Sequence, residues 1–160
     1  MSRSDRLFAG VGLVCLAAVG AALVSQYRFD MQPCPWCVLQ RVIYLAIALA
    51  CGLGLVWRQA TGRVVAAGLA LVLALCGIGA ALWQHFKAAA SASCNLTFAD
   101  QVVSQWLHLD SLSPEVFSPR ASCADAAVNL LGIPYDFWSL ALFCAMAIAL
   151  VRGLRSPAAR

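Results

Sequence analysis

Two cysteines separated by two residues stand just ahead of a long apolar run, in the segment Pro33-Cys34-Pro35-Trp36-Cys37. Proline suits the first position of a helix, so a helix beginning here places Cys34 near its N-cap and Cys37 in its first turn. Unpaired N–H groups and the helix dipole stabilise a thiolate at that end. Because such CxxC pairs are usually exchangeable, the motif predicts thiol–disulfide chemistry, with a purely structural disulfide as the alternative.

Arg41 follows Cys37 by four residues inside the apolar run. This spacing puts both side chains on one helix face, with Arg41 about 6 Å deeper. A charge within a membrane-spanning helix costs roughly 2.5–3.5 kcal/mol at its centre and less near its end. The guanidinium either stabilises a Cys37 thiolate, donates to the carbonyl of a ligand at the hydrocarbon boundary, or only extends to the lipid headgroups.

A second candidate pair is formed by Cys94 and Cys123, with 28 residues between them. Cys94 lies in a polar, loop-like stretch. The segment Ser122-Cys123-Ala124-Asp125 has the pattern of a capping box and predicts a short helix that ends at Gly132. A disulfide between a loop and a helix start would be reachable by another protein, and structural closure of the loop is the alternative. Between the two cysteines, residues 97–109 predict an amphipathic helix at the membrane surface, or a packed lid helix.

The remaining candidate residues have simpler interpretations. Cys15, Cys51, Cys76 and Cys144 lie in apolar runs and are expected to be small packing residues. His85 stands at the end of the third run, where it either protonates a reduced ligand or only lies in the interface. Asp136 lies near the start of the fourth apolar run and is expected to be an acidic residue that the dipole of that helix stabilises.

The amino-acid composition indicates a membrane protein, so membrane-spanning helices must hold these side chains in place. The chain has 160 residues, 62% of them hydrophobic and only 11% charged, with a mean hydropathy of +0.82. Disorder is excluded because it needs low hydrophobicity and high charge, and scattered basic residues disfavour nucleic-acid binding. Four runs are long enough to cross a bilayer, at residues 7–25, 38–57, 64–83 and 134–151. A signal peptide is the alternative for the first run, but that run exceeds a signal core in length. We therefore expect a single all-α integral membrane domain over residues 1–160, a four-transmembrane-helix bundle with outward loops at 26–37 and 84–133.

The charges predict how this bundle is oriented. Seven basic residues fall on one side of the four runs: Arg3, Arg6, Arg58, Arg63, Arg152, Arg155 and Arg160. The positive-inside rule places that side, and both termini, in the cytoplasm. Cys34, Cys37, Cys94 and Cys123 then face the oxidising side, where disulfides persist.

A redox-active CxxC at a membrane surface needs an electron acceptor. The sequence has no GxGxxG motif, no paired-histidine haem pattern within the runs and no iron–sulfur cysteine run. A mobile, lipid-soluble carrier is therefore expected. A quinone fits, because it is apolar, has two carbonyls and takes the two electrons that one dithiol supplies.

At these residues the chain resembles the DsbB family of bacterial membrane disulfide bond formation proteins. The resemblance lies in four spans, the run Cys-Pro-Trp-Cys-Val-Leu-Gln-Arg at residues 34–41, and a second cysteine pair on the long outward loop. It implies a protein-disulfide:quinone oxidoreductase in the bacterial inner membrane. The implied disulfides are Cys34–Cys37 and Cys94–Cys123.

The resemblance also implies roles for individual residues. Cys94 would form the mixed disulfide with a DsbA-type periplasmic thioredoxin-fold partner, and Cys123 would then attack Cys34. Cys37 would pass the electrons to ubiquinone or menaquinone, with Arg41 beside that quinone. His85 resembles a histidine at the end of the family's third span. The resemblance implies neither a metal nor a nucleic acid.

Three other classes of protein share some of these features. Vitamin-K-epoxide-reductase-like proteins use four cysteines and a quinone, but their quinone-facing CxxC lies late in the bundle. Four cysteines can also hold zinc, although the long second spacing disfavours that geometry. A non-enzymatic assembly protein with two structural disulfides would lose no function on replacement of Cys37.

Overall fold

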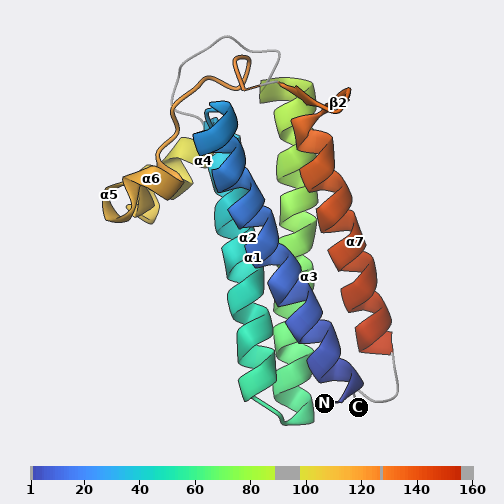
Figure 1. Ribbon diagram of the computed structural model, residues 1–160. Helices are drawn as coiled ribbons and strands as arrows, with labels where there is room; N and C mark the ends of the chain where they lie inside the picture. The colour runs from blue at the N-terminus through green and yellow to red at the C-terminus, as the bar shows by residue number, and fades with distance from the viewer. Residues whose placement is uncertain (1, 89–97, 127, 156–160) are drawn as a thin grey trace.

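The computed structural model describes residues 2–88, 98–126 and 128–155, and four long apolar helices dominate it (Figure 1). These are α1 (Arg3–Phe29), α2 (Pro35–Val56), α3 (Ala60–Trp83) and α7 (Tyr135–Arg155), and a π-helical turn, η1 (Gln84–Ala88), continues α3. Each of the four is long and apolar enough to cross a membrane. The expected four-helix membrane architecture is confirmed. Each helix extends beyond its predicted run at one end or both, because hydropathy marks only the part of a helix that is apolar throughout.

Local signals set the helix ends that matter for the cysteines. α1 ends at Asp30, which adopts the left-handed conformation with φ 53°. After a short link, Cys34 is the N-cap of α2 and Pro35 occupies the first turn. The Cys37 N–H donates to Cys34 Sγ over 3.3 Å, so a thiol takes the capping role usually filled by an oxygen. The sequence pattern around the CxxC motif therefore predicted this helix start correctly.

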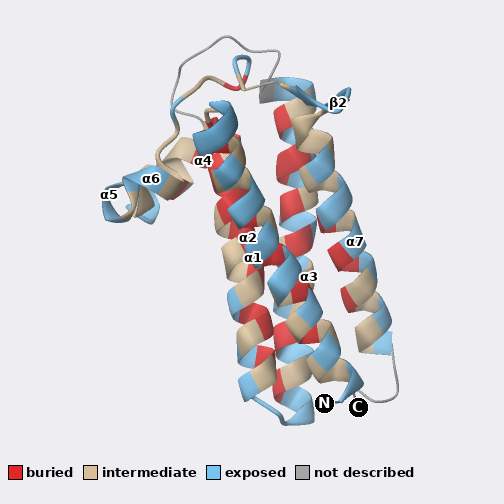
Figure 2. Cartoon of the chain, in the orientation of Figure 1, coloured by how far each residue is buried: buried red, intermediate tan, exposed pale blue. Residues whose placement is uncertain are grey.

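Packing in the bundle relies on small residues. α2 lies against both α1 and α3, and α3 lies against α7. α3 presents buried alanines to its neighbours, and a Cβ at Gly77 would overlap the ring of Phe143 on α7. Small residues allow close approach of helices in lipid, where no hydrophobic effect drives helices together. Buried residues gather where the helices face one another (Figure 2).

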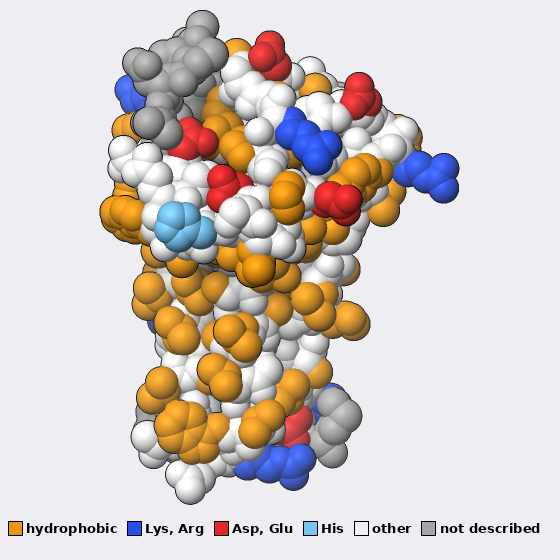
Figure 3. Space-filling model, turned by 90° about the vertical axis from the view of Figure 1, so that its left-hand side faces the viewer, with side chains coloured by type: hydrophobic (Ala, Val, Ile, Leu, Met, Phe, Trp, Pro, Cys, Tyr) orange, Lys and Arg blue, Asp and Glu red, His pale blue; other side chains and the backbone are white. Residues whose placement is uncertain are grey.

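The outer surface of the bundle suits a bilayer. Large apolar side chains such as Leu13, Leu49 and Val72 are exposed along the helices. In Figure 3, charged side chains gather toward the two ends of the molecule, and hydrophobic side chains dominate between them.

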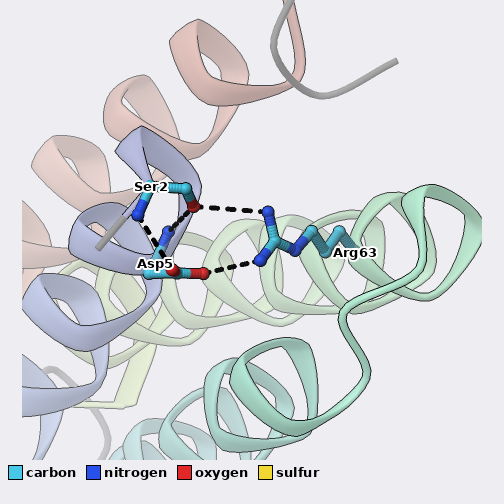
Figure 4. A network of polar contacts seen from close by, with 3 residues as sticks. All are labelled: Ser2, Asp5 and Arg63. Atoms are coloured by element: carbon cyan, nitrogen blue, oxygen red, sulfur yellow. Dashed lines mark hydrogen bonds and ion pairs between the residues drawn. The ribbon is translucent and has the colours of Figure 1, made fainter.

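One end of the bundle is fastened by a polar network (Figure 4). Ser2 and Asp5 form a capping box at the start of α1, and Arg63 of α3 donates to Asp5 Oδ1 over 2.6 Å and to Ser2 Oγ over 3.3 Å. The start of α1, the α2–α3 link and the end of α7 lie together at this end (Figure 1). The basic residues at the ends of these elements are thus collected on one side of the molecule, as the charge pattern predicted.

The long segment between α3 and α7 differs from the sequence-based expectation. The amphipathic helix expected over 97–109 is found from Phe98 to Trp106, as two continuous pieces, and two further short helices follow it, so the described part contains four helical pieces. They are α4 (Phe98–Asp100), the π-helical η2 (Gln101–Trp106), α5 (Leu109–Leu112) and α6 (Pro114–Phe117). His108, with φ 48°, interrupts the helical path. Ala99 and Val103 face the core, whereas Phe98 and Trp106 are exposed and their rings meet edge to face.

The predicted helix from Ser122 to Gly132 is wrong. Ser122 and Asp125 do make the capping contacts, but they close only one turn. A hairpin follows, in which β1 (Asn129–Leu130) pairs with β2 (Ile133–Pro134). Leu131 and Gly132 both have positive φ, the conformation that a two-residue hairpin turn requires. Tyr135, the first residue of α7, donates its N–H to the Val128 carbonyl over 2.9 Å, so the hairpin leads directly into the helix.

Candidate active site

The two cysteines of the CxxC motif face different surroundings. Their sulfur atoms lie 2.6 Å apart, in position to form the predicted disulfide. Cys34 is fully buried at the helix start, beneath the outer loop segment, while Cys37 is half-buried one helical turn further on. Cys37 lines a cavity inside the bundle, whereas Cys34 is not among the described residues that do. The motif therefore connects the outer loop with the bundle interior.

The outer loop brings Cys123 onto Cys34. The backbone N–H groups of Arg120 and Ala121 both donate to the Pro33 carbonyl, over 2.9 and 3.3 Å. Beyond this contact, the Cys123 sulfur hydrogen-bonds the Cys34 thiol and accepts the N–H of Trp36 in the first turn of α2. Two backbone hydrogen bonds thus deliver a third sulfur to the start of the CxxC helix.

This arrangement polarises the two sulfurs in opposite senses. The hydrogen bond donated by Cys34 lowers the pKa of the Cys123 thiol below its usual value, and the Trp36 N–H acts in the same direction. The pKa of Cys34 is raised, first by its hydrogen bonds to Cys123 and Cys37 and then by burial. These contacts therefore favour the thiolate form of Cys123 and the neutral form of Cys34.

Cys94 lies outside the residues that the structure describes. The Cys94–Cys123 disulfide therefore stays a prediction, as does the role of Cys94 toward a partner.

Arg41 is buried and held by three acceptors. Its Nη1 donates to Gln26 Oε1 over 2.8 Å and to the Val116 carbonyl over 2.9 Å, and its Nη2 donates to the Ala22 carbonyl over 3.4 Å. These partners belong to α1 and to the loop helix α6. Extension toward headgroups is therefore not the conformation of this side chain, which links the loop to the membrane-spanning helices.

Cys37 and Arg41 line the same cavity, which has a volume of about 800 Å³. Small-molecule sites typically occupy roughly 300–1,000 Å³. The inner walls are formed by α1, α2 and α7, with apolar groups such as Ala18, Trp138 and Leu142. The loop segments form the outer wall and add polar and charged side chains. The arrangement combines a largely apolar chamber, a sulfur nucleophile and a cationic hydrogen-bond donor.

Three buried glutamines lie at or beside this cavity, and sequence reasoning assigned none of them a role: Gln40 and Gln84 line it, and Gln26 contacts Arg41. Gln26 holds Arg41 and donates to the Glu115 carbonyl. Gln40 donates to Gln84 over 2.8 Å, and Gln84 donates to Cys37 Sγ over 3.4 Å. The available signal was their position: each is an uncharged polar residue within or next to an apolar run.

His85 stands apart from the cavity. Its Nδ1 lies 2.8 Å from Asp136 Oδ2, and its ring contacts Phe86 and Phe137. His85 is not among the described residues that line the cavity. Its participation in chemistry stays a prediction, and Asp136 has a partner besides the helix dipole.

The four cysteines within the spans occupy ordinary packing positions. Cys15 and Cys51 are buried, and Cys15 Sγ lies 3.3 Å from Met146 Sδ. Cys76 is exposed on the surface of α3, and Cys144 is half-buried on α7.

Comparison with known proteins places this geometry in a family. Residues 4–152 match the family model described as disulfide bond formation protein DsbB. Disulfide bond formation protein B of Pseudomonas syringae pv. tomato is 32% identical over 98% of this chain and 95% of its own length. Disulfide bond formation protein B 1 of Pseudomonas savastanoi pv. phaseolicola is also 32% identical, with the same coverage. Disulfide bond formation protein B of Burkholderia thailandensis is 29% identical over 96% of this chain and 91% of its own length. The chain therefore belongs to the DsbB family of membrane disulfide bond formation proteins.

Proposed function

We propose that this protein is a protein-disulfide:quinone oxidoreductase. It reoxidises a DsbA-type, thioredoxin-fold dithiol protein in the periplasm and passes the electron pair to a membrane quinone, ubiquinone or menaquinone. The observation that carries the proposal is the division of the CxxC motif, in which Cys34 meets Cys123 of the outer loop and Cys37 meets an apolar cavity beside Arg41.

The outer half of the reaction is disulfide exchange. A thiolate of the partner attacks the Cys94–Cys123 disulfide at Cys94, and Cys123 leaves as a thiolate. Cys123 then attacks Cys34, so that a Cys123–Cys34 bond forms and the Cys34–Cys37 bond breaks. Cys37 leaves as a thiolate with the electron pair. The backbone N–H of Trp36 favours the thiolate form of Cys123 that this attack needs.

The inner half of the reaction delivers the electron pair to the cavity. The largely apolar walls suit a quinone ring, and the remaining N–H groups of Arg41 can orient a carbonyl oxygen. When bound, the quinone accepts two electrons and two protons. The second thiol of the partner closes the partner disulfide and releases Cys94. Cys94 then re-forms its bond to Cys123 and frees Cys34, and Cys34 and Cys37 re-form their disulfide as the electron pair passes to the quinone. The net change is one partner dithiol oxidised to a disulfide and one quinone reduced to a hydroquinone.

The charge distribution supports the matching orientation in the membrane. We propose that the protein resides in the bacterial inner membrane with both termini in the cytoplasm, because the Arg-rich end carries the start of α1 and the end of α7. The cysteines of the site then face the periplasm.

The test is a quinone-reduction assay on the purified protein in detergent, with a reduced thioredoxin-fold protein as the electron donor. We expect quinone absorbance to fall only when protein and donor are both present. Cys34→Ser and Cys37→Ser should abolish turnover, and Cys76→Ser, on the lipid-facing surface, serves as the matched control with full turnover. Full activity in Cys37→Ser would refute the proposed function and favour structural disulfides.

A further inference from the structure

A chain of three side chains ends on the sulfur that faces the cavity. Gln40 of α2 donates from Nε2 to Gln84 Oε1 over 2.8 Å. Gln84, at the start of η1, donates from Nε2 to Cys37 Sγ over 3.4 Å, within the range for a hydrogen bond to sulfur. Both glutamines are nearly inaccessible, at 4% and 6% exposure, and both line the cavity.

The order of the chain fixes which amide atom Gln84 presents to the sulfur. An amide has a carbonyl oxygen that accepts and an NH₂ that donates. Because the Gln84 oxygen accepts from Gln40, its NH₂ is directed to Cys37. A donor favours the charged thiolate over the neutral thiol. Gln40 thus selects the Gln84 orientation that suits a thiolate.

Gln84 is the neighbouring side chain that is placed to donate to a Cys37 thiolate. The Arg41 guanidinium lies on the same face of α2, but its described hydrogen bonds go to Gln26, Val116 and Ala22. Among described side chains, the hydrogen-bond partners of Cys37 Sγ are Cys34 and Gln84. In the proposed reaction, Cys34 becomes bonded to Cys123 when Cys37 is released. Gln84 is then the partner that remains.

We propose that Gln84, oriented by Gln40, is a positioning residue that holds Cys37 as a thiolate toward the cavity. The proposal rests on the proposed function, in which Cys37 delivers the electron pair. A neutral amide suits this place, because it stabilises the negative sulfur without adding a second buried charge to the cavity.

The test measures the Cys37 thiolate directly, without quinone or partner. Full-length reduced protein in detergent is treated with iodoacetamide across a pH series, and the alkylation rate at Cys37 is followed by mass spectrometry. Gln84→Met keeps the length of the side chain and removes the donor. We expect the pH of half-maximal rate to rise by about one unit, a tenfold loss of thiolate at a given pH.

Two further variants and a control make the result specific. Gln40→Met should raise the half-maximal pH by a smaller amount, because Gln84 keeps its NH₂ but loses its orientation. Gln84→Glu should raise it by more than Gln84→Met, since a carboxylate opposes the thiolate, and it retains a polar group if the methionine variant fails to fold. Gln105→Met changes an exposed glutamine of η2 and should leave the profile unchanged.

An unchanged Cys37 profile in folded Gln84→Met or Gln84→Glu would overturn the inference. A wild-type protein that reduces no quinone would instead overturn the proposed function, and the alkylation profile would still report on Gln84. The two failures are therefore distinguishable.

Discussion

Arg41 is the residue at which the proposed acceptor site can be tested most sharply. A guanidinium has five N–H donors, and three hydrogen bonds from Arg41 go to Gln26, Val116 and Ala22. Two N–H groups are left for a ligand in the cavity that Arg41 lines. In Arg41→Ala, both are removed together with the charge.

The geometry sets the size of the expected effect. A hydrogen bond that involves a charged group contributes about 1.5–3 kcal/mol. Since 1.4 kcal/mol corresponds to a factor of ten, loss of one such bond to a quinone carbonyl should raise the apparent KM for quinone by roughly 10- to 150-fold. The KM for the dithiol partner should change little, because in the proposed reaction the partner exchanges with Cys94 and not at the cavity.

The assay varies the quinone concentration at saturating donor protein and follows quinone absorbance. Arg41 also holds the loop through Val116, so the control must weaken the loop without touching the cavity. Tyr27→Phe does this, because the Tyr27 hydroxyl donates to the neighbouring Glu115 carbonyl over 3.1 Å and Tyr27 is not among the described lining residues. If Arg41→Ala leaves the KM for quinone within twofold of wild type, or if Tyr27→Phe raises it equally, Arg41 does not bind the acceptor.

Three further predictions concern the loop, its thiolate and the bundle. Ala121→Pro removes one of the two N–H groups that hold the loop to the Pro33 carbonyl. The exchange from Cys123 to Cys34 should therefore slow by about 2- to 10-fold, measured by quenched-flow trapping of the mixed disulfide. An unchanged rate would show that the contact does not position the loop. The lowered pKa of Cys123 keeps its thiolate populated at lower pH than in a free cysteine. In the reduced protein, Cys34→Ala removes the thiol that donates to Cys123 and should move the alkylation profile of Cys123 to higher pH. Identical profiles in the variant and the wild type would show that Cys34 does not lower this pKa. Gly77→Ala should lower the thermal unfolding midpoint, because overpacking against the ring on α7 costs about 1–3 kcal/mol, whereas Gly79→Ala meets no atom within 4 Å and should be neutral; equal midpoints would refute the packing argument.

The membrane-spanning helices and the CxxC position could be predicted because the governing signals are local. Apolar runs of sufficient length fix the spans, and Pro35 after Cys34 fixes where α2 starts. Helical periodicity alone predicts that Arg41 lies on the same face of α2 as Cys37. These features need no knowledge of which helices are neighbours.

The glutamine contacts could not be predicted because they depend on tertiary packing. Gln40 and Gln84 lie 44 positions apart, on different helices, and meet only because α2 packs along α3. The prediction of a helix from Ser122 to Gly132 in the outer loop was wrong for a related reason. Ser122 begins a turn that a helix or a hairpin can follow, and the positive φ values at Leu131 and Gly132 decide for the hairpin.

The single helical turn between Cys34 and Cys37 has a physical consequence for charge crossing the membrane boundary. One sulfur is in contact with a water-side loop and its neighbour, 2.6 Å away, opens to an oily chamber. In the proposed function, an electron pair therefore passes through two adjacent sulfur atoms, while its water-soluble donor and its lipid-soluble acceptor each stay in their own phase. The start of α2 therefore holds one reactive sulfur on the loop side and the other on the cavity side.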